Sequence, residues 1–130
     1  MILGVHHIAL KCQGVEAFRE TIHFYHDVLG MPIVRTWGTG EELGAMLAVG
    51  DSMMEIFSNA SDTLETGSIR HFALATDDVD DCVRKAEAAG YEVFIQPKDI
   101  VIASNPPYPA RIAFCRGPVG EEIEFFKPKA

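Results

Sequence analysis

The sequence has few cysteines and no pattern that pairs them. Of 130 residues only three are cysteine, Cys12, Cys82 and Cys115, and they stand far apart without a CxxC spacing. An odd, widely spaced set of this kind is typical of reduced thiols in a reducing compartment. We therefore expect three buried core thiols and no disulfide framework.

Long apolar runs and clusters of positive charge are also missing. The longest apolar runs span only about five residues, far fewer than a membrane span needs. The first ten residues, MILGVHHIAL, have neither the basic start nor the apolar segment of a secretory signal, so we expect a cytoplasmic location. The formal net charge is −8 and no Lys/Arg run offsets it, which argues against binding to nucleic acid.

What the chain does have is enough apolar residues for a core, arranged in an internal repeat. Hydrophobic residues make up 48% of it, which suits one domain of this length. The segment GVHHIALKC (4–12) is similar to SIRHFALAT (68–76), and MEIF (54–57) is similar to IEFF (123–126). The two His residues are 64 positions apart (71 − 7) and the two Glu residues 69 (124 − 55), a difference that loop lengths can absorb.

Each repeat carries one helical pattern. Apolar residues at three- and four-residue steps predict a first helix that ends at Gly30: Val15, Phe18, Ile22, Tyr25 and Leu29. In the second repeat Thr76 or Asp77 could cap a helix that buries Val79, Val83 and Ala86 and ends at Gly90.

Strand patterns surround both helices, so each repeat is predicted to be a βαβββ module. The strands expected are HHIAL, MPIVRTW, LGAMLAV and SMMEIFS, then RHFAL, YEVFIQP, ARIAFCR and EEIEFF. The predicted fold is α+β: one domain, 1–130, built from a first module, 1–58, a polar linker, 59–67, and a second module, 68–130.

Four polar side chains interrupt these strands at equivalent places. Side chains alternate between the two faces of a strand. His7 and Glu55 therefore point away from the apolar face that packs under the helix, and so do His71 and Glu124. If the sheets curl into a cup, two imidazoles and two carboxylates converge, which is a plausible set of ligands for a divalent metal. Each residue alone could instead be solvent-facing or hydrogen-bonded; the repetition of both in each module is what favours the metal site.

Six motifs along the chain follow one another in a characteristic order: HHIAL, FYHDVLGM (24–31), Gly50-Asp51 before MEIF, RHFALATDDVDD, AAGYEV and GPVGEEIEFF. Through these motifs the chain resembles the vicinal oxygen chelate superfamily over nearly its whole length. This superfamily includes glyoxalases, bleomycin-resistance proteins and extradiol dioxygenases. The resemblance implies paired βαβββ modules forming a cup around one divalent metal. It places the metal ligands at His7, Glu55, His71 and Glu124.

The full His/Glu/His/Glu set is most similar to that of bacterial glyoxalase I. The implied activity is that of a lyase or isomerase acting on the hemithioacetal of methylglyoxal, by proton transfer through an enediolate that the metal stabilises. Zinc or nickel is the expected metal, with cobalt, manganese or iron as alternatives. The alternative functions are an acyl-CoA epimerase of the methylmalonyl-CoA type and a protein that binds a small molecule without turnover.

By the same resemblance Glu124 is the base that moves the proton, and Glu55 serves the other face of the substrate. Lys11 and Asn59 occupy the places of an arginine and an asparagine that contact glutathione, although lysine lacks the arginine fork. Both could equally be surface residues. A small-molecule substrate and a homodimer are implied, with each cup built from one chain or from two.

Four further residues could line a pocket mouth or meet an anionic substrate, or be ordinary packing and strand ends: Trp37, Tyr108, Arg111 and Arg116.

Overall fold

The chain folds into two compact units, Met1–Leu64 and Glu65–Ala130. The structure is a computed structural model that describes residue 1, residues 3–61 and residues 67–129, so the middle of the predicted linker, 62–66, lies outside the described residues. Each unit contains one four-stranded sheet and one α-helix, in the order β, α, β, β, β. The predicted two-module α+β fold is confirmed.

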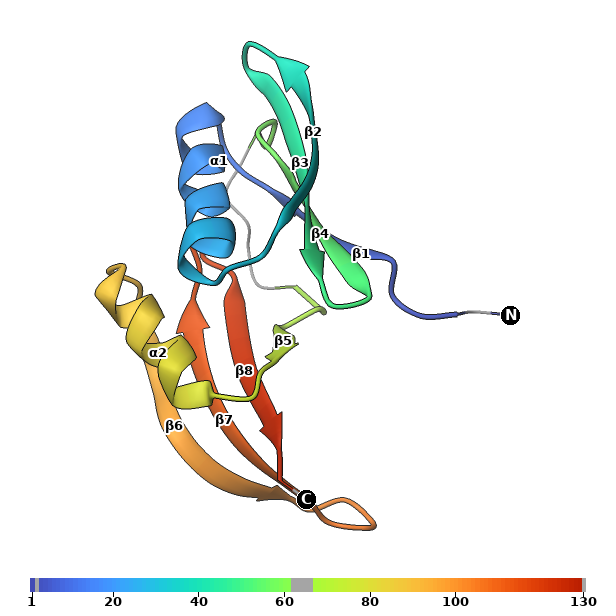
Figure 1. Cartoon of the computed structure of the whole chain (residues 1–130), viewed down its shortest axis with the longest axis vertical. Coiled ribbons are helices and arrows are strands. Elements are labelled where there is room, and N and C mark those ends of the chain that lie inside the picture. Colours follow the sequence, from blue (N-terminus) through green and yellow to red (C-terminus); the bar gives the residue numbers. More distant parts are fainter. Residues whose placement is uncertain (2, 62–66, 130) are drawn as a thin grey trace. The chain divides into compact units, whose positions relative to one another are not determined.

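The first unit forms a mixed sheet with strand order β1-β4-β3-β2 (Figure 1). The chain runs through β1 (His7–Lys11), helix α1 (Val15–Ile22), the π-helical segment η1 (His23–Val28), β2 (Ile33–Thr39), β3 (Glu42–Val49) and β4 (Ser52–Phe57). β1 pairs with β4 in parallel, whereas the other two pairings are antiparallel. The helical segment makes the crossover that a parallel pair requires.

The second unit repeats this topology with strand order β5-β8-β7-β6. Its elements are β5 (Phe72–Ala75), helix α2 (Val79–Ala88), β6 (Val93–Ile102), β7 (Tyr108–Arg116) and β8 (Glu122–Pro128). β5 pairs with β8 in parallel, as β1 does with β4. β6 runs through Pro97 to Ile102, beyond the predicted strand, and its pairing with β7 shifts register on the way.

The register of the two parallel pairs is the same. Ala9 lies opposite Glu55 in the first unit, and Ala73 lies opposite Glu124 in the second. Each Ala follows its His by two residues, so the repeat seen in the sequence is also a repeat in three dimensions.

One face of the first sheet packs against α1 and forms the core. Leu10, Leu47 and Ile56 on this face are at most 7% exposed, and the helix adds Phe18. The Cys12 thiol donates a hydrogen bond to Thr21 Oγ1 on α1 at 3.3 Å, which places the end of β1 directly under the helix. Burying each large apolar side chain stabilises the fold by about 1.5–3 kcal/mol.

The first helix differs from its prediction in its second half. After Ile22 it widens into η1, and both Phe24 and Tyr25 become fully buried. A steady 3.6-residue period predicted only Tyr25 on the apolar face; the wider π turn brings its neighbour in as well. The segment still ends as expected, with Leu29 as cap and Gly30 at a φ of 80°. Within the described ranges, no helix is long and apolar enough to cross a membrane.

Helix α2 is capped by Asp78, so the predicted cap at Thr76 or Asp77 is wrong. The Asp78 side chain accepts a hydrogen bond from the Asp81 N–H at 3.0 Å, three residues ahead. Thr76 is held differently, because its hydroxyl oxygen accepts from the Asp78 N–H at 3.1 Å. The predicted buried face of Val79, Val83 and Ala86 is confirmed.

The thiols of Cys12 and Cys115 are buried as expected, and Cys82 is half-buried. Burial raises the pKa of the Cys115 thiol to about 12, so it stays protonated and unreactive near neutral pH.

An ion-pair cluster ties α2 to the sheet of the second unit. Arg111 on β7 donates to both carboxylate oxygens of Asp80 on α2, at 2.7 and 2.9 Å, and to Asp99 on β6 at 3.2 Å. A two-bond arginine–carboxylate contact is among the stronger side-chain hydrogen bonds. The Arg111 guanidinium holds the pKa of Asp80 below its usual value, while Lys129 and Arg111 do so for Asp99.

These lowered pKa values predict a stability difference that depends on pH. Because the folded state holds Asp80 and Asp99 ionised, their contribution is present above the ordinary value of 3.8 and is lost as pH falls through the lowered values. Arg111→Met should therefore lower the melting temperature at pH 7, with the difference from wild type shrinking below pH 3.8. Arg84→Met is the control, because among the described residues Arg84 forms its ion pair within α2, with Asp81 at 3.3 Å. Equal shifts for both variants, or a shift for Arg111→Met that does not change with pH, would contradict the assignment.

Candidate functional site

The face of each sheet turned away from its helix, here called the open face, carries the polar residues singled out in the sequence. In the first unit His7 Nε2 lies 3.5 Å from Glu55 Oε1. The imidazole is 39% exposed and the carboxylate 17%. The parallel pairing of β1 with β4 creates this contact, because it sets Ala9 beside Glu55 and leaves space over the small side chain.

The open face of the second unit holds the equivalent pair. His71 Nε2 lies 3.3 Å from Glu124 Oε1, with side-chain exposures of 40% and 12%. His71 immediately precedes β5 and is not part of the strand, contrary to the prediction, yet it reaches the same position. Burial raises the pKa of the Glu124 carboxyl above its ordinary value, and the neighbouring His71 only partly offsets this.

The donor atoms in each pair have the spacing of two ligands on one ion. Zinc–nitrogen and zinc–oxygen bonds of about 2.0–2.2 Å put neighbouring ligand atoms roughly 3.0–3.5 Å apart in tetrahedral or octahedral geometry. The separations of 3.5 and 3.3 Å in the two pairs meet this condition. Within the described residues of either unit, no third His, Cys, Asp or Glu joins a pair in a group suited to a metal. Each unit thus brings one imidazole and one carboxylate together on its open face.

Lys11 and Asn59 lie at the end of the first sheet where β1 and β4 finish. Lys11 is exposed and sits opposite Phe57 in the parallel ladder. Asn59 forms an isolated bridge with Gln13 and lines a hollow of about 440 Å³ together with Gly14 and neighbouring residues. Their roles toward a substrate stay predictions.

The residue beside each glutamate on the open face differs between the units. Met46 on β3 lies opposite Glu55, whereas Phe114 on β7 lies opposite Glu124. The Phe114 ring also meets the His71 ring edge-to-face, with centroids 5.1 Å apart. Sequence reasoning missed Phe114, although its alternation with Cys115 in ARIAFCR could have placed it on the open face.

A pair of aromatic side chains lies on the open face of each sheet, at the end beyond the glutamate. Phe57 meets the Trp37 ring with centroids 5.9 Å apart, and Phe126 meets Tyr108 at 5.7 Å. Each Phe follows its glutamate by two residues. Trp37 is 39% exposed and Tyr108 is 44% exposed, and a place for either at a pocket mouth stays a prediction.

The two arginines named in the sequence go to different places. Arg111 points to the helix side of the second sheet, where Asp80 and Asp99 hold it. The hypothesis that it meets a substrate beside the site is therefore wrong. Arg116 pairs in register with Glu122 and lies over the Phe94 ring at 4.6 Å from its centroid, on the open face.

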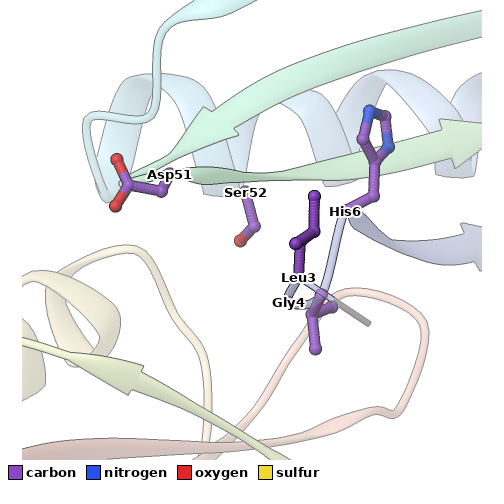
Figure 2. Close-up of a pocket in the computed structure, with 6 residues that line it drawn as sticks. Leu3, Gly4, His6, Asp51 and Ser52 are labelled. Carbon is purple, nitrogen blue, oxygen red and sulfur yellow. The ribbon is translucent and has the colours of Figure 1, made fainter. Parts of the chain in front are cut away.

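A hollow of about 470 Å³ opens beside the start of β1. Figure 2 shows Leu3 and Gly4 on the N-terminal segment at one side of it, and Asp51 and Ser52 at the β3–β4 turn on the other. His6 also lines it, and His6 Nδ1 lies 3.0 Å from Nδ1 of His7. The hollow therefore adjoins the first His–Glu pair through His6.

Comparison with known proteins identifies the family. Residues 4–125 match the model of the Glyoxalase/Bleomycin resistance protein/Dioxygenase superfamily, so the chain belongs to this superfamily. No curated protein matches the chain.

Solved structures share the fold at low identity. The protein SMU.1112c is 22% identical, with a TM-score of 0.75 over 97% of this chain and 99% of that one. A glyoxalase family protein from Enterococcus faecalis is 20% identical, with a TM-score of 0.68 over 95% and 96%. A glyoxalase I mutant from Zea mays is 22% identical, with a TM-score of 0.74 over 95% of this chain and 46% of that one. Likeness at this level establishes the fold.

On the open face of the first sheet, the Trp37 side chain packs against Gly44 of the neighbouring strand. The indole lies against the Gly44 backbone, so a Cβ there would collide with its ring. Gly44→Ala should push the ring outward, lower the free energy of unfolding by about 1–3 kcal/mol, and shift tryptophan emission to longer wavelength. The signal is specific because the chain has one tryptophan.

Gly67→Ala is the control for Gly44→Ala, because a Cβ at Gly67 would meet nothing within 4 Å. Unchanged emission and stability in Gly44→Ala would show that Trp37 does not rest on Gly44.

Proposed function

We propose that this protein is a divalent-metal-dependent isomerase or lyase of the glyoxalase I type, acting on a hemithioacetal of methylglyoxal. The observation that carries the proposal is the pair of equivalent His–Glu contacts, 3.5 and 3.3 Å, on the open faces of the two units. The recurrence of the same pair at the same register of both sheets supports the proposal. Membership in the superfamily supports it.

His7, Glu55, His71 and Glu124 would hold the metal, and they come from one chain or from two chains of a homodimer. Imidazole and carboxylate donors suit zinc or nickel first, and also cobalt, manganese or iron. When bound, such an ion supplies a Lewis acid that stabilises negative charge on neighbouring substrate oxygens.

Glu124 is the base in this proposal. Its carboxylate is only 12% exposed and lies 3.3 Å from His71, so it would stand beside a substrate held at the metal. It would take the proton from the carbon that bears sulfur and hydroxyl, and return it to the adjacent carbon through an enediolate. Glu55 occupies the equivalent place in the other unit and would serve the opposite face of the substrate.

Lys11 would attract an anionic arm of the thiol, since it is exposed and has no carboxylate partner among the described residues. Asn59 would donate a hydrogen bond to the same arm. Both lie at one end of the first sheet, which supports a shared role.

Metal content is the first test. The purified protein should bind about one divalent ion per complete site, and His7→Ala and His71→Ala should each weaken binding by more than about 100-fold, because even outer groups contribute 10–100-fold. Mass spectrometry gives the stoichiometry and calorimetry gives the affinity. His23→Ala is the control: His23 lies on η1 and contacts Asp27 at 2.9 Å. If none of the five metals binds, the proposal is refuted.

Turnover is the second test, measured at saturating metal. Glu124→Gln should lower kcat for the methylglyoxal–glutathione hemithioacetal by about 10²–10⁴-fold, the usual worth of a general base. Glu20→Gln, an exposed change on α1, should leave kcat unchanged.

The same assay separates the alternatives. A metal-loaded protein that leaves hemithioacetals unchanged but exchanges the α-proton of a branched acyl-CoA would be an epimerase. One that binds small molecules without either reaction would be a sequestering protein.

A further inference from the structure

The outer edge of the first sheet is strand β2, and no strand of the described residues covers it. β2 is last in the order β1-β4-β3-β2, so its free edge presents backbone N–H and C=O groups that no neighbouring strand binds. All seven of its residues are exposed. They include three large apolar side chains: Ile33 at 40%, Val34 at 48% and Trp37 at 39%. An edge of this kind is a template for pairing with a further strand.

The equivalent edge of the second sheet is protected, whereas β2 is not. β6 contains Pro97, which has no N–H to donate, followed by the exposed charges of Lys98 and Asp99. Its register with β7 also shifts twice. Proline, charge and irregular register are features that keep natural edge strands from associating. β2 has no proline and a single charged residue, Arg35, and its register with β3 is continuous from Arg35 to Thr39.

Two exposed charged side chains near this edge form no ion pair with a described residue: Arg35 on β2 and Glu42 on β3. Arg35 pairs in register with Met46, which is on the open face, and Glu42 lies four residues from Met46 on the same strand. Because side chains alternate along a strand, both charges project from the open face. Four residues of a strand span about 13 Å, so the two side chains do not reach each other within one chain.

Antiparallel pairing of β2 with the β2 of a second copy would bring these charges together. The continuous part of β2, Arg35–Thr39, has Trp37 in its middle, and a two-fold axis there sets Arg35 opposite Thr39 of the second copy. Side chains directly opposite each other share one face. Within the second copy, Thr39 in turn lies beside Glu42. The arginine and the glutamate would thus face each other across a small threonine, once on each side of the axis.

We propose that the free edge of β2 binds the β2 of a second copy of this chain in antiparallel pairing, which makes one continuous sheet across a two-fold dimer. The charges favour a second copy over another protein, because the edge itself supplies both the cation, Arg35, and the anion, Glu42. In a two-fold contact each favourable interaction occurs twice. The interface needs no metal, so it stands or falls independently of the proposed reaction.

Sedimentation equilibrium of the purified full chain tests the association. A contact made by one short strand belongs with the small, transient interfaces that bury less than about 1,200 Å² in total. We therefore expect the mass to double as the concentration rises, with a dissociation constant between about 1 μM and 1 mM. A chain that stays monomeric throughout this range leaves the edge of β2 to another protein and overturns the proposal.

Charge reversal locates the interface. Arg35→Glu and Glu42→Arg should each weaken association by about tenfold, because two ion pairs become two contacts between like charges. The double variant restores opposite charges and should recover the association, which excludes misfolding as the cause of the loss. Lys98→Glu on the protected edge, β6, is the matched control and should leave the dissociation constant unchanged. Single variants without effect, a double variant without recovery, or a loss in Lys98→Glu would each overturn the interface.

The one tryptophan of the chain reports on the same contact. Because Trp37 would lie at the two-fold axis, association should cover its indole and move its emission to shorter wavelength as the concentration rises. The midpoint of this shift should coincide with that of the mass, and Arg35→Glu should move both to higher concentration. If the mass doubles while the emission stays constant, the copies meet elsewhere and the proposal is overturned.

Discussion

Parallel pairing of the first and last strand of each unit is the constraint on which the site depends. It brings together segments that are 46 positions apart at Ala9 and Glu55, and 51 apart at Ala73 and Glu124. The helical crossover makes this pairing possible and also covers one face of the sheet. The polar residues are left on the other face, where a small alanine beside each glutamate leaves space for the histidine side chain.

The residues that repeat in the sequence are the ones whose positions were predictable. His7, Glu55 and Glu124 could be assigned to the face opposite the helix because strand side chains alternate, and the structure brings each histidine to its glutamate. The buried face of α2 followed from helical spacing in the same way.

Features that depend on local backbone geometry were not predictable. The π-helical turn buries Phe24 as well as Tyr25, which no fixed period anticipates. The cap of α2 falls on Asp78 because its carboxylate reaches the Asp81 N–H, a choice among adjacent polar residues that composition does not decide. Arg111 is another case: only its ion pairs with Asp80 and Asp99 reveal that it serves the helix side.

The apolar core and the polar residues lie on opposite faces of each sheet, and this determines which substitutions the fold tolerates. In the first unit the buried apolar side chains of the sheet share the face that packs against the helix: Leu10, Ala45, Leu47, Met54 and Ile56. His7 and Glu55 on the open face are partly exposed and contribute little to this core. A substitution at either position therefore leaves the core intact. The open face can change its side chains while the scaffold remains folded.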